Sequence, residues 1–368
     1  MKSILCTLIL LTNFNLAAEE LFPVGRGQKY GYVDNQGEWV IGADFQDAQR
    51  FKAGVALVQK GDLYGYLNKE GKLVISPGFS IAYPFQEEVA AVRKGSSYKD
   101  LWGFIKGDGS YLIQPAYRTV GSFKQGLAAV QNNKLKFGFI NKEGETIIKP
   151  IFNTVYDFSE GFAAVNRKEK WYFIDTTGQP LTKKKKKKKR KKRKKKKKKK
   201  LKFKKYYQAG SFSEGLAPVR NKKGKWGYIN SAGKLVIKYK FKASANSVGS
   251  FFSGLARAKR GDFFGFINKK GKWVIPARYE AAGRFSEGLA AVKVKGKWGY
   301  INTSGKLVIK PYFTDPFYYP DRYFTDFFYR TRQGAYAFVN GIALPRVGTG
   351  KGQPRILKSD GSLIEPEE

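Results

Sequence analysis

Short apolar runs alternate with glycine- and lysine-rich breaks along most of this chain. Residues 285–311 show the pattern most clearly, reading F-S-E-G-L-A-A-V-K-V-K-G-K-W-G-Y-I-N-T-S-G-K-L-V-I-K-P. Three runs of β-branched and aromatic residues, at 289–292, 298–302 and 307–309, are bounded by Gly, Asn and Lys. Runs of this length and composition predict short β-strands joined by hairpin turns. No apolar period of 3.6 residues is sustained, so no amphipathic helix is expected.

Close copies of this stretch recur from end to end. The run that follows the F-S-E-G element starts at intervals of 34 to 54 residues in eight copies: 21–24, 55–58, 89–92, 127–130, 162–165, 216–219, 255–258 and 289–292. A ninth, degraded copy lies at 335–339. Units of this size predict a repeat array, because one unit is too small to bury a core without its neighbours.

Both faces of each predicted sheet are apolar. In the second strand of the unit, Trp298 and Tyr300 face one side, and Gly299 and Ile301 face the other. A sheet that is apolar on both sides must be covered on both sides. The pattern therefore predicts an all-β tandem repeat of short antiparallel meanders, forming a propeller-like ring or an open β superhelix or solenoid. The unit of 34 residues is short for a four-stranded blade. A three-stranded blade with an extra short strand in the connector that holds F-S-E-G is compatible with either arrangement, and we favour the propeller-like ring.

Two sets of glycines recur with the strands. The second strand carries an aromatic-Gly pair at 30–31, 64–65, 102–103, 137–138, 226–227, 264–265 and 298–299, and only the fifth copy departs, with Trp171-Tyr172. We interpret this glycine as a slot for an aromatic ring of a neighbouring unit. The turn before the third strand has a glycine where a positive φ is needed: Gly37, Gly71, Gly109, Gly144, Gly178, Gly233, Gly271 and Gly305.

The elements W-G-Y-I-N, G-K-L-V-I-K-P and F-S-E-G-L-A-A-V resemble the WG or KWG repeat, a bacterial β-rich repeat family. Because several elements recur together in order, the resemblance is specific, and it covers residues 21–311. It implies a repeat architecture and no particular activity. The region after Pro311 departs from the pattern.

The chain divides into five expected parts. Residues 1–18 have a charged start, a short apolar run and a small-residue end, as expected of a secretory signal peptide. Repeats one to five occupy 19–182, a disordered Lys/Arg insertion in a connector occupies 183–200, and the end of repeat five with repeats six to eight occupies 201–311. Residues 312–368 are expected to form an aromatic C-terminal cap with the degraded ninth repeat, and 355–364 resembles a last hairpin that closes the array. The expected location is the periplasm, the cell surface or the medium.

The amino-acid composition excludes several kinds of catalytic and metal-binding site. The chain has no His, and Cys6 lies within the expected signal peptide. Zinc sites with imidazole or thiolate ligands, and Ser-His-Asp or Cys-His catalysis, are thereby excluded from the mature chain. We expect no cofactor, no metal site and no catalytic residue. The glutamates Glu87, Glu160, Glu214 and Glu287 recur in the F-S-E-G turns, so they are interpreted as turn-forming residues that satisfy backbone amides.

Positive charge dominates the repeat body. Removing Lys2 and the eighteen charges of 183–200 from the net charge of +41 leaves +22. Much of it lies in the turn between the first and second strands of each unit, here named the rim turn. These turns are expected to share one edge of the array and to form a basic rim. Its candidate residues are Lys60, Arg93, Lys94, Lys134, Lys136, Arg167, Lys168, Arg220, Lys222, Lys223, Lys259, Arg260, Lys293 and Lys295.

Three functions remain open at this stage. The first is a non-enzymatic exported protein that captures an anionic polymer through the basic rim and the lysine tract; nucleic acid would be bound without sequence specificity. The second is a protein-interaction scaffold that uses the aromatic cap, with Tyr318, Tyr319 and Tyr323 as candidate contacts. The third is a carboxylate-based hydrolase, which repeated rather than unique glutamates disfavour.

Overall fold

A computed structural model describes residues 20–97, 99–181, 205–242, 248–313, 342–343, 356–360 and 362–364. Every regular element in these residues is a β-strand, which confirms the all-β prediction. Within the same residues, no helix is long and apolar enough to cross a membrane. The expected signal peptide, the tract 183–200, the degraded repeat at 335–339 and the tyrosines Tyr318, Tyr319 and Tyr323 lie outside the described residues.

The strands of the described residues form nine antiparallel sheets, numbered one to nine in chain order. Sheet one contains β1 (Phe22–Arg26), β2 (Lys29–Val33) and β3 (Trp39–Phe45). Sheet two contains β4 (Asp47–Ala48), β5 (Val55–Lys60), β6 (Leu63–Asn68) and β7 (Leu73–Phe79). Sheet three contains β8 (Ile81–Ala82), β9 (Ala90–Arg93), β10 (Trp102–Ile105) and β11 (Tyr111–Tyr117). Sheet four contains β12 (Thr119–Val120), β13 (Ala128–Gln131), β14 (Phe137–Ile140) and β15 (Thr146–Phe152). Sheet five contains β16 (Thr154–Val155), β17 (Phe162–Arg167) and β18 (Lys170–Asp175). Sheet six contains β19 (Gln208–Ala209), β20 (Leu216–Arg220), β21 (Lys225–Asn230) and β22 (Leu235–Lys242). Sheet seven contains β23 (Val248–Phe252), β24 (Leu255–Arg260), β25 (Phe263–Asn268) and β26 (Trp273–Tyr279). Sheet eight contains β27 (Ala281–Ala282), β28 (Leu289–Val294), β29 (Lys297–Asn302) and β30 (Leu307–Phe313). Sheet nine contains β31 (Ile342–Ala343), β32 (Ile356–Lys358) and β33 (Leu363–Ile364).

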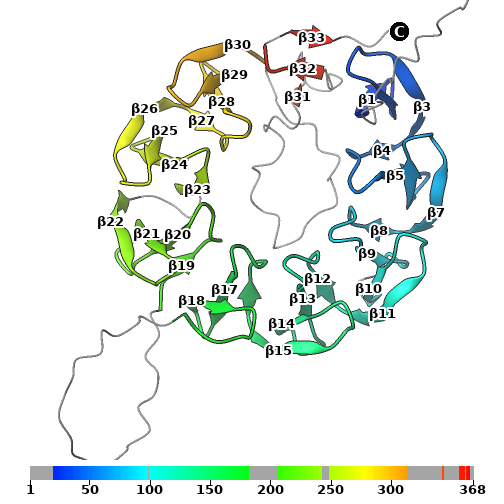
Figure 1. The fold of residues 1–368 in the computed structure, drawn as a ribbon, viewed down its shortest axis with the longest axis horizontal. Coiled ribbons are helices and arrows are strands. Elements are labelled where there is room, and N and C mark those ends of the chain that lie inside the picture. The colour runs from blue at the N-terminus through cyan, green and yellow to red at the C-terminus, as the bar shows by residue number, and fades with distance from the viewer. Residues whose placement is uncertain are drawn as a thin grey trace, which may run out of the picture.

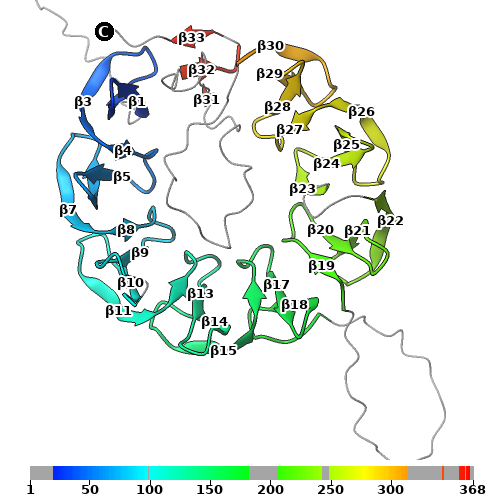
Figure 2. The same ribbon diagram turned by 180° about the vertical axis from the view of Figure 1, so that it is seen from behind.

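The sheets stand side by side around a ring (Figure 1), and the view from behind shows the same order (Figure 2). Short strands such as β4 and β8 face the centre, and long strands such as β7 and β11 form the outer edge. This arrangement confirms the predicted propeller-like ring and excludes the alternative of an open β superhelix or solenoid. The short inner strand is the extra strand expected in the connector. Sheet nine lies between sheets eight and one, where the last hairpin was expected, and Leu357 packs into the core of sheet eight.

Each sequence unit contributes to two neighbouring sheets. In the stretch from β2 to β5, β2 and β3 complete sheet one, while β4 and β5 begin sheet two. Neighbouring units are therefore joined by strand pairing as well as by packing. We expect single units to lack stability alone, because each would leave sheet hydrogen bonds unpaired.

Aromatic contacts repeat between successive sheets. In sheets one to seven, the buried ring in the strand that follows the turn between the first and second strands of the unit meets the Phe of the following F-S-E-G element, as in Tyr66 and Phe85, whose centroids are 4.8 Å apart. Equivalent pairs are Tyr32–Phe51, Phe104–Phe123, Phe139–Phe158, Phe173–Phe212, Tyr228–Phe251 and Phe266–Phe285. Where the ring is Tyr66, its hydroxyl also donates to the carbonyl of Tyr83 at 2.7 Å. The apolar core is thus divided into similar layers between sheets.

The glycine of the aromatic-Gly pair has a different role from the one the sequence suggested. A Cβ built on Gly299 would lie 2.5 Å from the carbonyl oxygen of Ile309 and 2.8 Å from the nitrogen of Pro311, both in the adjacent outer strand β30. That strand bulges here, because its register shifts between Trp298 and Tyr300. The interpretation of this glycine as a slot for a neighbouring unit's aromatic ring was wrong. The bulged backbone of its own sheet fills the space.

The turn glycines behave as predicted. Every one of the eight, from Gly37 to Gly305, has a positive φ. In the turn 68–72, the side chain of Asn68 accepts the N–H of Lys72 at 2.8 Å, and Gly71 donates to the Asn68 carbonyl at 3.1 Å. Asn and Gly together define this turn, here named the Asn-Gly turn.

The residues that flank the lysine tract pair with one and the same strand. Ile174 pairs with Pro180, and Trp171 pairs with Tyr206, so both flanks lie beside β18 at the outer edge of sheet five. The tract is therefore inserted where the outer strand of sheet five would lie, at the position at which the outer strands of other sheets bulge. From the sequence it was expected in a connector between strands. This position also accounts for Tyr172, which replaces the glycine in the unit whose outer strand is interrupted at the bulge.

Candidate functional site

The strand order places the turns of the ring on two opposite faces. Successive antiparallel strands reverse direction, so the F-S-E-G loop and the Asn-Gly turn of a sheet lie at one end of its strands and the rim turn lies at the other. Contacts between sheets agree with this. Lys269 of an Asn-Gly turn pairs with Glu214 of an F-S-E-G loop at 3.0 Å. We name the two faces the loop face and the rim face.

Charge is distributed unequally between the faces. The rim turns hold twenty Lys and Arg residues against four acidic residues, in the ranges 26–29, 60–63, 93–101, 131–136, 166–170, 220–225, 259–263 and 293–297. The loop face holds thirteen basic and thirteen acidic residues, in the ranges 34–38, 49–54, 68–72, 83–88, 106–110, 121–126, 141–145, 156–161, 175–179, 210–215, 230–234, 249–254, 268–272, 283–288 and 302–306. The rim face is therefore strongly basic and the loop face is neutral.

All fourteen candidate rim residues lie among the described residues, at the ends of the strands that the rim turns join. Nine are exposed: Lys60, Lys94, Lys134, Arg167, Lys168, Lys222, Lys223, Arg260 and Lys295. The other five, Arg93, Lys136, Arg220, Lys259 and Lys293, are half-buried. Further rim cations were missed, among them Lys29, Lys170, Lys225 and Lys297. They begin the second strand of the unit, and including both ends of each turn would have found them.

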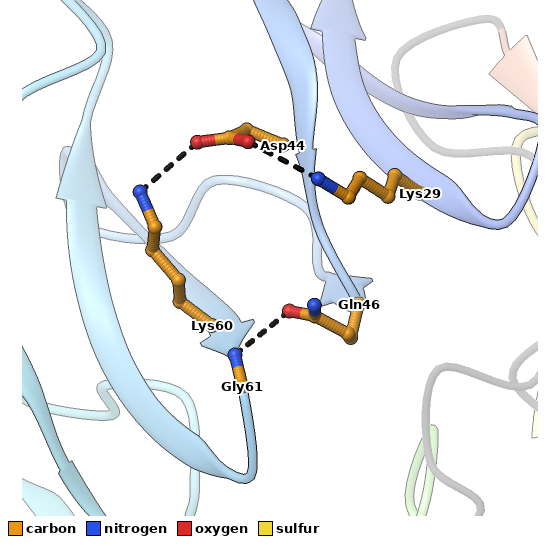
Figure 3. A network of polar contacts seen from close by, with 5 residues as sticks. All are labelled: Lys29, Asp44, Gln46, Lys60 and Gly61. Atoms are coloured by element: carbon orange, nitrogen blue, oxygen red, sulfur yellow. Dashed lines mark hydrogen bonds and ion pairs between the residues drawn. The ribbon is translucent and has the colours of Figure 1, made fainter.

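Parts of the rim are neutralised by nearby acids. Asp44 of β3 lies between Lys60, at 3.0 Å, and Lys29, at 3.5 Å (Figure 3). These two cations lower the pKa of Asp44, with the hydrogen bond from Lys60 as the largest cause. Beside them, the side-chain oxygen of Gln46 accepts the N–H of Gly61 at 2.9 Å, joining sheets one and two (Figure 3). Lys60 is thus committed to a contact between sheets.

Other candidate cations are engaged in different ways. Lys259 lies 3.7 Å from Asp262 within its own turn. The Arg93 guanidinium lies 5.6 Å from the centroid of the Trp102 ring. Lys136 donates to the side chain of Asn153 at 2.8 Å. The basic rim is therefore uneven, and its cations differ in their freedom to meet a ligand.

The F-S-E-G glutamates and serines fasten each loop to the next. Glu160 accepts the N–H of Gly215 at 2.9 Å, and Ser159 donates to the Phe212 carbonyl at 2.8 Å. Ser213 and Glu214 repeat this with Phe251 and Gly254, and Glu87 accepts the N–H groups of residues 125 and 126. For Glu87, Glu160 and Glu214, the interpretation that these glutamates satisfy turn amides is confirmed, with the difference that the amides belong to the following loop. In the described part of the chain, no three His, Cys, Asp or Glu side chains gather as a metal site would require.

Glu160→Ala is expected to lower the free energy of unfolding by about 1–2 kcal/mol, because the N–H of Gly215 loses a charged acceptor. Urea unfolding monitored by tryptophan fluorescence measures the change. Glu143→Ala is the matched control, since Glu143 is an exposed glutamate of the same face. An equal effect of both substitutions would contradict the fastening role.

A propeller-like ring of repeated antiparallel sheets defines the class of protein. The particular family follows from the repeats: the model of the WG containing repeat matches at 30–64, 64–98, 102–135, 137–171, 195–226, 226–262, 264–298 and 298–318. The chain belongs to this family, as the sequence motifs indicated. Seven of the eight matches begin at an aromatic-Gly pair, whereas the match at 195–226 begins within the lysine tract and ends at Trp226. A full match from one pair towards the next spans two of the sheets described above.

Solved structures resemble this chain in fold. The "eukaryotic initiation factor" structure aligns at a TM-score of 0.56 and 10% identity, covering 94% of this chain and 95% of that one. The computationally designed Ika8 protein aligns at a TM-score of 0.48 and 10% identity, covering 94% and 98%. BamB from Moraxella catarrhalis aligns at 0.43 and 11% identity, covering 89% and 93%. No curated protein matches the sequence.

Proposed function

We propose that this WG-repeat ring binds an anionic polymer through its rim face. The propeller-like repeat fold supports a non-enzymatic scaffold, and the function must then come from its surface. One observation carries the proposal: the rim turns hold twenty basic against four acidic side chains, whereas the turns and loops of the loop face are balanced. Charge that served solubility alone would have no reason to gather on one face.

The physical basis is counterion release. A polyanion keeps condensed cations around it, and a protein that neutralises several of its charges sets those cations free. Binding then weakens steeply with added salt and requires no specific sequence or shape of the polymer. The lysines of 183–200 would add to this attraction, since their flanks join the outer edge of sheet five.

The test is retention of the full chain on immobilised heparin across a salt gradient. Lys222→Glu/Lys223→Glu is expected to elute at clearly lower salt and to reduce the salt slope of binding by about one for each ion pair with the polymer that is removed. Lys270→Glu/Lys272→Glu, with the same change of charge on exposed residues of the loop face, is the matched control and should elute later than the rim variant. Equal shifts for both variants would show that only net charge matters.

A second pair of proteins separates the rim from the lysine tract. Deletion of residues 183–200 should leave salt-sensitive retention that the rim variant weakens further. If the deletion abolishes retention, the rim is not the binding surface. If retention is insensitive to salt in every protein, capture of an anionic polymer is wrong, and a protein partner becomes the better hypothesis.

A further inference from the structure

Tyr207 of the rim face differs from most of its equivalents in the other repeats. Tyr207 lies in the connector between sheets five and six, and its N–H donates to the Arg220 carbonyl at 2.9 Å. The same backbone bond identifies its equivalents: Gln46, Ser80, Arg118, Asn153 and Glu280. Four of these use their side chains to fasten a rim turn: Gln46 accepts from Gly61, Ser80 donates to the Arg93 carbonyl, Asn153 accepts from Lys136, and Glu280 accepts from Gly296. Tyr207 instead is 55% exposed.

The ring stands between two strongly basic turns. The ammonium of Lys170, from the rim turn of sheet five, lies 5.9 Å from the centroid of the Tyr207 ring. On the other side, Arg220 begins the rim turn of sheet six. The ranges 166–170 and 220–225 together hold seven cations and one carboxylate, that of Glu169. The side chains of Lys168, Lys222, Lys223 and Lys225 have no polar partner among the described residues.

The turn of sheet six is held in shape before any ligand arrives. The Asn221 side chain accepts the N–H groups of Lys223 and Lys225, both at 3.0 Å, and the Arg220 guanidinium donates to the Gly224 carbonyl at 3.3 Å. A turn that is already ordered loses little backbone freedom when it binds. By contrast, the rim turns of sheets two and seven have acids close to their cations, at Asp44 and Asp262.

We infer that Tyr207, with Lys168, Lys170, Lys222, Lys223 and Lys225, forms a subsite for an acidic polysaccharide; this rests on the proposed function of the rim face. A sugar ring has an apolar C–H face that stacks on tyrosine, and its carboxylate or sulfate accepts charge-assisted hydrogen bonds from the lysines. A polymer with charge alone would gain nothing from the exposed ring. A single-stranded nucleic acid is disfavoured, because it is bound by successive aromatic platforms, and the described residues of these two turns and their connector present one exposed ring.

The test compares the binding of an oligogalacturonate and of poly-L-glutamate to the full chain by calorimetry. Tyr207→Ala is expected to weaken oligogalacturonate binding about fivefold, to leave its salt slope unchanged, and to leave poly-L-glutamate binding unchanged. Tyr312→Ala is the matched control, since Tyr312 is 56% exposed on the outer strand of sheet eight. It should change neither affinity. Carbodiimide cross-linking of the bound oligogalacturonate, followed by peptide mapping, should label Lys168, Lys170, Lys222 or Lys223.

The outcomes separate the two proposals. If Tyr207→Ala has no effect while Lys222→Glu/Lys223→Glu weakens binding, the subsite is wrong and the proposed function of the rim stands. If neither variant affects binding and salt has no influence, the proposed function fails as well. Tighter binding of an oligothymidylate, with a larger loss on Tyr207→Ala, would replace the polysaccharide with a nucleic acid. Cross-links confined to 183–200 would overturn the subsite.

Discussion

Replacing Gly65 with alanine is expected to lower the free energy of unfolding by about 3 kcal/mol. A Cβ at this position would lie 2.6 Å from the Ile75 carbonyl oxygen and 2.7 Å from the nitrogen of Pro77. Both atoms belong to the backbone of the bulged outer strand β7, so no side-chain rotation relieves the clash. The strand must shift outward, which weakens its pairing with β6.

Urea unfolding of the full chain measures this loss, and the sequence provides a matched control. Gly42 lies in the outer strand β3, and a Cβ built on it meets no atom within 4 Å. Gly42→Ala should therefore be close to neutral, whereas Gly65→Ala should not. Equal stability of the two variants would mean that the outer strand yields without cost, and that the bulge does not explain the recurring glycine.

This glycine shows where prediction from the sequence reached its limit. The aromatic-Gly pair was recognisable because it recurs, and its unfavourable place inside a strand indicated a close approach. The identity of the approaching group was not recoverable, because a bulge changes the register of one strand against another and leaves no periodic signal. Pro77, Pro115, Pro150 and Pro311 mark the bulges. A proline lacks the N–H that a regular outer strand would use, which could have indicated irregular pairing.

The architecture was easier to predict than the site. Apolar runs on both faces of the sheets and a repeat of 34 residues required neighbours on both sides, and the Asn-Gly turns fixed the hairpins. The rim cations followed from the same repeat. Their neutralisation did not, because Asp44 is 15 residues from Lys29 and 16 from Lys60 and the contact depends on how sheets meet. Tyr207 was missed for a similar reason. The role proposed for this connector residue depends on the rim turns on either side of it, which the fold brings together.

Alkaline pH is expected to unfold the ring within about one to two pH units above pH 10. Tyr32, Tyr66, Tyr228 and Tyr300 are almost fully buried, and burial raises the pKa of each. Below pH 10 these tyrosines are protonated in both states, so the folded state loses nothing. Above it the unfolded chain releases protons that the folded chain retains, and stability falls by about 1.4 kcal/mol per pH unit for each tyrosine.

Four such groups together change stability by more than about 5 kcal/mol per pH unit, which is comparable with the whole stability of many domains. Tyr66→Phe removes one of them, so its unfolding midpoint should lie at higher pH, although it loses the bond to the Tyr83 carbonyl. Phe104, Phe139, Phe173 and Phe266 occupy the equivalent position, so the ring accepts Phe there. Tyr207→Phe, at an exposed site, should leave the midpoint unchanged. The measurement follows tyrosinate absorbance and circular dichroism together as the pH is raised. Ionisation of the buried tyrosines before the sheets unfold would contradict this explanation.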